Sequence, residues 1–150
     1  MADKRPPPFT TLSGSQDSSE REGRNIMQSD QRMWGIVAGL SGFVAIVMGA
    51  VGAHAVADPH GAALVETASI YELVHAVVIL WLCGARGKYL SVARWAFLIG
   101  TVLFCGTIYL KATAGWDAAV RLAPLGGVSF MLGWLLIALE YCISKGRTET

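Results

Sequence analysis

The segment from Trp34 to Ala57, WGIVAGLSGFVAIVMGAVGAHAVA, decides the fold because it contains no Asp, Glu, Lys or Arg over its whole length. As an α-helix it would span about 36 Å, which exceeds the hydrocarbon core of a bilayer at about 30 Å. A buried helix of a soluble domain is usually shorter and amphipathic. The segment therefore predicts a membrane-spanning helix at residues 34–57.

Three further apolar segments follow, at about residues 68–85, 92–113 and 122–143. The chain of 150 residues is 53% hydrophobic and 15% charged, with a mean hydropathy of +0.47, which is too apolar for an ordinary soluble domain. The connections are short, so consecutive helices should be antiparallel neighbours. We expect an all-α, integral membrane four-helix bundle over residues 33–143, with short loops.

Both tails are polar. Residues 1–32 include three consecutive prolines and almost no apolar pattern, so we expect a disordered tail that is solvated or binds a partner. Its apolar segment begins too late for a signal peptide, and it is too acidic for a transit peptide. Residues 144–150 form a second short tail.

The Lys and Arg residues indicate an orientation. Close to the predicted helices, eight lie at the end that carries the tails and the loop between the second and third helices, whereas two lie at the other end of the bundle. The positive-inside rule then places both termini in the cytoplasm. The membrane that we expect is the bacterial plasma (inner) membrane. The net charge of +1 gives no general reason to expect nucleic acid. The eight cationic residues at the cytoplasmic end are Arg21, Arg24, Arg32, Arg86, Lys88, Arg94, Lys145 and Arg147. The two at the other end are Lys111 and Arg121.

Small residues recur on the first and fourth helices and allow close approach of a second backbone. We expect them to serve packing inside the monomer, and a face for a homo-oligomer is the alternative. The expected packing residues are Gly35, Gly39, Gly49, Gly52, Ala53, Gly126, Gly127 and Gly133.

Polar side chains gather in the half of the bundle that should face away from the cytoplasm. Ionisable groups at membrane depth are costly and tend to face a bundle interior or a wet cavity. In the structural interpretation, Glu72 pairs with His75, His54 bonds to a carbonyl, and Lys111 extends to the headgroups. In the functional interpretation, the two histidines and Glu72 titrate together in a pocket. The cluster comprises His54, Tyr71, Glu72, His75, Thr107, Tyr109 and Lys111.

Cofactor chemistry is disfavoured. His54 and His75 could flank a haem, or bind zinc or copper with Glu72, but the two histidines are offset by about one turn and no tight ligand spacing occurs. The three cysteines lie in apolar segments without a CxxC motif, so we interpret them as small buried hydrophobic residues. No nucleophile with an adjacent base stands out. We expect no cofactor, no metal and no enzymatic activity.

Four motifs in order, GAVGAHAV, TASIYELVHA, GTIYLKATAG and APLGGVSFMLGW, carry a family resemblance. Over residues 33–143 the chain resembles a family of small inner-membrane proteins of unknown function that includes bacterial YgdD and YwdK and eukaryotic transmembrane protein 256. The resemblance implies about four helices and no established activity. The positions that it carries over are Gly49, Gly52, His54, Tyr71, His75, Tyr109, Pro124, Gly126, Gly127 and Trp134.

The chain departs from that family's pattern at two places and in its long N-terminal tail. Glu72 stands where an uncharged residue is expected, and Cys105-Gly106-Thr107 stands where a Gly-Ser pair is more usual. We therefore expect a multi-pass membrane protein of uncharacterised activity that serves as an accessory or assembly component of a membrane complex. The alternative is a small permease or proton-coupled carrier that uses the His/Glu cluster.

Overall fold

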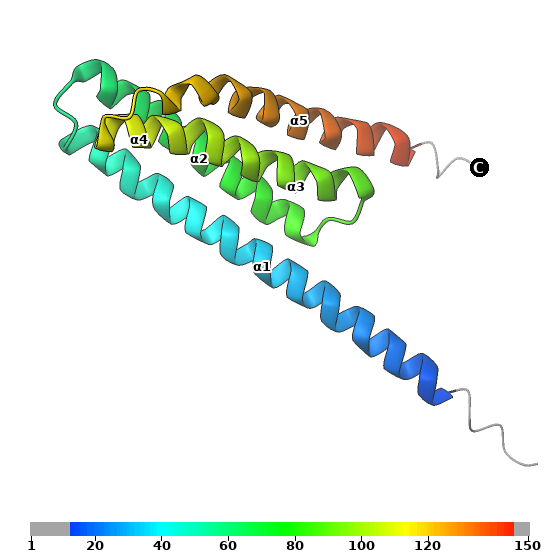
Figure 1. Ribbon diagram of the computed structural model, residues 1–150. Coiled ribbons are helices and arrows are strands. Elements are labelled where there is room, and N and C mark those ends of the chain that lie inside the picture. The colour runs from blue at the N-terminus through cyan, green and yellow to red at the C-terminus, as the bar shows by residue number, and fades with distance from the viewer. Residues whose placement is uncertain (1–12, 146–150) are drawn as a thin grey trace, which may run out of the picture.

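The computed structural model describes residues 13–145, and this part of the chain contains helices and no strand. Four of its helical segments are long and apolar enough to cross a membrane, which confirms the predicted all-α membrane bundle (Figure 1). The elements are α1 (Ser13–His54), α2 (Pro59–Gly84), α3 (Lys88–Gly100), the π-helical η1 (Thr101–Gly106), α4 (Thr107–Ala114), the 3₁₀ helix η2 (Ala119–Leu122) and α5 (Ala123–Lys145).

The helices form two main pairs. α1 packs along α2, and α3 packs along α5, while α2 also contacts α3, η1 and α4. α3, η1 and α4 follow one another without a break and together form the third membrane-crossing segment, Lys88–Ala114. The N-terminal end of α1 extends well past the ends of the other helices (Figure 1). One side of α1, which carries Ile36, Phe43 and Ile46, is exposed in the structure.

α1 begins at Ser13, inside the segment for which the sequence predicts disorder. Extending an existing helix avoids the cost of nucleation, and residues 13–32 contain Glu, Gln and Arg, which are good helix formers. The apolar helix that follows therefore acts as a nucleus for the polar segment before it. The prediction for residues 1–12 lies outside the described residues, as does that for residues 146–150.

α2 begins at Pro59, well before the predicted start near residue 68. Asp58 caps the helix because its Oδ2 accepts a hydrogen bond of 2.8 Å from the Gly61 N–H, and Pro59 occupies the first turn, where no N–H is needed. The DPHG segment is thus a helix start rather than only a turn. Consequently Glu72 and His75 lie near the middle of α2, not one or two turns from its outer end.

The fully buried side chains come mainly from α2, α3 and η1, so the core lies where these elements meet. The largest are Val65, Ile79, Leu82, Phe97 and Cys105. By contrast, α1 and α5 expose many large apolar side chains. Phe43 and Ile46 are each 66% exposed and Met131 is 64% exposed. A surface this apolar is unfavourable in water and is the surface that lipid solvates.

Small residues allow close helix contacts at four of the predicted positions. A Cβ atom at Gly49 would lie 3.2 Å from Ser69 Oγ, and one at Gly52 would lie 3.0 Å from Val65 Cγ1, so both glycines serve the α1–α2 contact. Gly126 and Gly133 allow α5 to pack closely against η1 and α3. There a Cβ atom would lie 2.5 Å from the Phe104 backbone nitrogen and 2.6 Å from Phe97 Cε1, respectively.

The other predicted packing positions are open. Nothing lies within 4 Å of a Cβ atom built at Gly35, Gly39 or Gly127, and Ala53 is exposed. Packing inside the monomer therefore explains only part of the small-residue pattern. The GxxxG motif of Gly35 and Gly39 has no partner helix among residues 13–145.

Candidate functional site

Glu72 joins three helices near the middle of the bundle. It is 5% exposed, and both of its carboxyl oxygens accept a hydrogen bond. Ser41 Oγ on α1 donates to Oε1 at 3.0 Å, and the Tyr109 hydroxyl on α4 donates to Oε2 at 2.9 Å. We call these three residues the Glu72 node. Both partners are neutral hydroxyl groups, so the node holds α1, α2 and α4 together by directional hydrogen bonds.

The node follows from the local sequence. Ser41 belongs to the small-residue face of α1, where its short side chain lets α2 approach. Tyr109 is long enough to reach Glu72 from α4, and its ring remains buried at 9% exposure. Hydrocarbon offers no water to a buried polar group, so each hydroxyl and the carboxyl group depend on one another. The polar cluster predicted from the sequence includes Glu72 and Tyr109 but not Ser41.

His75, one turn further along α2, has different partners. Its Nδ1 lies 2.7 Å from the Tyr71 carbonyl oxygen, and because a carbonyl can only accept, Nδ1 carries the hydrogen. Nε2 then accepts from Trp134 Nε1 on α5 at 3.4 Å. The ring stacks on Phe130 with a centroid distance of 3.7 Å and an interplanar angle of 7°. The His75 ring on α2 thus packs against two aromatic side chains of α5, Phe130 and Trp134.

The predicted pairing of Glu72 with His75 is wrong. Glu72 bonds to α1 and α4, whereas His75 bonds to its own helix and to α5. Residues three apart on a helix lie on adjacent parts of its surface, but they need not share a neighbour. Each of these side chains faces a different helix, because α2 is surrounded on several sides.

His54 lies apart from both groups. It is exposed at the C-terminal end of α1, thirteen positions beyond Ser41 (54 minus 41), or about 20 Å along the helix axis. The structure therefore does not assemble His54, Glu72 and His75 into one site. Over residues 13–145 no group of three His, Cys, Asp or Glu side chains is placed to hold a metal ion.

The remaining predicted site residues are also dispersed. Thr107 donates within its own helical segment, to the Leu103 carbonyl at 2.6 Å. Lys111 pairs with Asp117 at 3.4 Å on the surface, beside the loop after α4, instead of only extending to headgroups. Tyr71 is 46% exposed, and its ring lies near His75 and Phe104.

A small crevice of about 250 Å³ lies beside His75 on the outer surface of α2 and α5. Apolar and aromatic side chains make up most of its lining, which includes Ile70, Tyr71, Val74 and Trp134. Trp134 and Phe130 are site residues that helix periodicity alone did not reveal, although the family resemblance marked Trp134. Their role depends on which face of α5 meets α2, and that requires the tertiary structure.

Comparison with known proteins gives a consistent result. The family model described as "Protein of unknown function (DUF423)" matches residues 48–127. The UPF0382 inner membrane protein YgdD of Escherichia coli (strain K12) is 37% identical over 109 residues, covering 68% of this chain and 83% of that protein. A UPF0382 membrane protein of Haemophilus influenzae is 28% identical over 112 residues, covering 71% and 90%. No solved structure matches.

Proposed function

Since this chain belongs to the family of unknown function DUF423, whose curated relatives are named membrane proteins, we propose that it is an accessory component of a membrane complex without catalytic activity of its own. It is a multi-pass membrane protein, as its four membrane-spanning helices and its relatives show. The proposed role is to present one helix to another membrane protein while the remaining helices keep that helix in place.

The observation that carries this proposal is the outer face of α1, which we define as Gly35, Ile36, Gly39, Phe43 and Ile46. The two glycines have open space where a side chain would be, and the three large residues are 56–66% exposed. Small residues four apart beside large apolar residues form the surface on which membrane helices associate closely. A second transmembrane helix of another protein is the partner that fits this surface.

We expect the full-length tagged chain, purified in mild detergent, to retain a stoichiometric membrane-protein partner that mass spectrometry identifies. Gly39→Leu should reduce that partner at least tenfold, because a bulky side chain keeps the backbones apart. Gly127→Leu, an open glycine on α5, is the matched control and should leave the partner in place. A chain that purifies alone, in wild type and in both variants, would contradict the accessory role.

We also propose that both termini and the α2–α3 loop face the cytoplasm and that the chain lies in a bacterial inner membrane. The Lys and Arg asymmetry supports this orientation, and the name of the Escherichia coli relative supports the compartment. A reporter active only in the periplasm should be silent after Thr150 and active in the α1–α2 loop. The reverse pattern would overturn the orientation.

One observation favours a second candidate, a proton-coupled carrier. Glu72 is an ionisable group buried near the middle of a membrane-spanning helix, and such groups often mark ion pathways. Against it, His54 is far from Glu72, and both carboxyl oxygens of Glu72 are already bonded to hydroxyl groups. Substitution of Glu72 by Gln separates the two functions, because an amide keeps the hydrogen bonds but does not titrate.

A further inference from the structure

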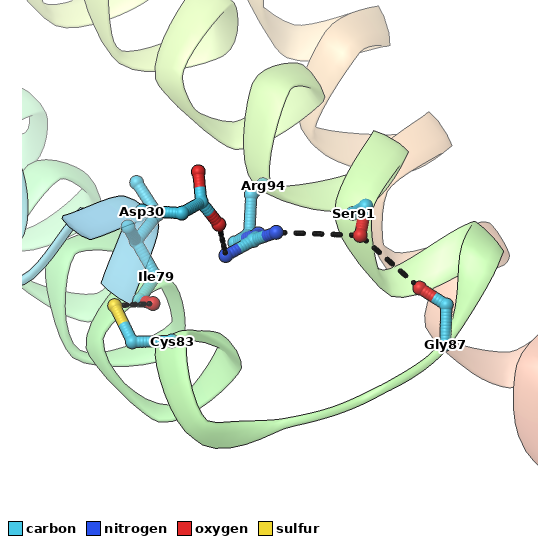
Figure 2. Close-up of polar contacts among 6 residues, drawn as sticks. All are labelled: Asp30, Ile79, Cys83, Gly87, Ser91 and Arg94. Carbon is cyan, nitrogen blue, oxygen red and sulfur yellow. Dashed lines mark hydrogen bonds and ion pairs between the residues drawn. The ribbon is translucent and has the colours of Figure 1, made fainter. Parts of the chain in front are cut away.

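Arg94 lies buried where α1 passes α3. The sequence places it among the cations of the α2–α3 loop region, yet the structure leaves it only 9% exposed. Its Nη1 donates to Asp30 Oδ2 on α1 at 3.2 Å, and its Nη2 donates to Ser91 Oγ at 3.3 Å (Figure 2). Its Cζ also lies 5.3 Å from the ring centroid of Trp34. Arg94 therefore links α1 to α3 near the end of the bundle.

These contacts leave part of the guanidinium without a partner. A guanidinium has five N–H donors in a planar fork, and the Nε atom of Arg94 has no hydrogen-bond partner among the described residues. Within the part of the chain that the structure describes, Asp30 is the one carboxylate bonded to Arg94, and its side chain is 45% exposed, so the pair is partly open to solvent. A buried cation that is incompletely paired is costly, and a further anionic acceptor would lower that cost.

A cavity of about 420 Å³ lies directly beside this arginine, bounded by α1, the α2–α3 loop and the start of α3. Two cationic side chains, Arg86 and Arg94, and one carboxylate, Asp30, line it, so its charged groups favour an anion. Ser91 adds a hydroxyl group and Gln31 an amide. Met27, Cys83 and Ala85 give the same cavity an apolar side.

We propose that this Arg94 cavity binds a phosphate group, supplied by an anionic phospholipid of the adjacent leaflet. Phosphate oxygens match the planar fork of arginine, and basic pockets at the ends of membrane helices suit lipid headgroups. Arg86, which is exposed, supplies a second positive charge at the edge of the cavity. The apolar wall accommodates the glycerol and the first methylene groups of the acyl chains.

The test uses the full-length chain in detergent micelles and native mass spectrometry with added dioleoylphosphatidylglycerol or dioleoylphosphatidylcholine. We expect the wild-type chain to retain the anionic lipid preferentially. Arg94→Lys keeps the charge but loses the fork and should weaken retention about tenfold, and Arg86→Gln should weaken it several-fold. Arg86 is exposed, so its substitution reports on binding without disturbing the core.

Lys88→Gln is the matched control, because Lys88 is exposed at the same end of the bundle and does not line the cavity. It should leave lipid retention unchanged. Inorganic phosphate, added to the same samples, should compete with the lipid. If the chain binds inorganic phosphate but not the lipid, and Arg94→Lys abolishes that binding, the cavity is a phosphate site whose ligand is soluble. That result would overturn the assignment to a phospholipid. Equal retention in all variants, or an equal loss in Lys88→Gln, would overturn the proposal.

Discussion

Replacing Gly126 with Ala should lower the free energy of unfolding by about 1–3 kcal/mol, the usual cost of inserting a methyl group into a packed interior. The added Cβ would lie 2.5 Å from the backbone nitrogen of Phe104 in η1 and 2.8 Å from the Phe104 Cβ. Backbone atoms cannot rotate away as a side chain can, so α5 and η1 must separate. Denaturant titration of the protein in mixed micelles, followed by circular dichroism, measures the loss.

The next residue provides the control. Gly127 belongs to the same GG pair, but a Cβ atom there meets nothing within 4 Å. Gly127→Ala should therefore be neutral or stabilising by up to about 1 kcal/mol, because alanine favours the helix. If both substitutions destabilise the protein equally, α5 does not pack on η1 as the structure shows.

This pair illustrates what the sequence could predict. Long apolar segments are sufficient to predict four membrane helices, because bilayer thickness fixes their length. The small residues of α5 indicate a packing face. The sequence does not distinguish Gly126 from Gly127, however, because that choice depends on the rotation of α5 about its axis. Rotation is set by the side chains of α3 and η1, which are distant in sequence.

The candidate site shows a similar division. Glu72 and His75 were identified because ionisable residues are rare in apolar segments, and Tyr109 was identified with them. The hydrogen bonds of Glu72 to Ser41 and Tyr109 do not follow from the sequence, which favours a direct Glu72–His75 contact and a second helix that starts about two and a half turns later than Pro59. The Asp58–Pro59 pair was the available signal for the earlier start.

Replacing Glu72 with Ala should lower the free energy of unfolding by about 2–4 kcal/mol, because it leaves the hydroxyl groups of Ser41 and Tyr109 without their acceptor and opens a cavity. Glu66→Ala is the control on the same helix. Glu66 is exposed, so its loss should change stability by less than about 0.5 kcal/mol. Equal effects of the two substitutions would contradict the role of the Glu72 node.

Glu72→Gln separates a structural node from a proton carrier. The amide oxygen can accept one of the two hydrogen bonds, and the amide N–H can donate to the other hydroxyl oxygen, so both partners stay bonded. As a structural node, the variant should lose less than about 1 kcal/mol of stability and keep its membrane partner. A proton carrier would instead lose its flux, measured with a pH-sensitive dye in vesicles, because an amide does not titrate near neutral pH. We expect the stable, partner-bound outcome, because both carboxyl oxygens of Glu72 are already used to hold α1 and α4 against α2.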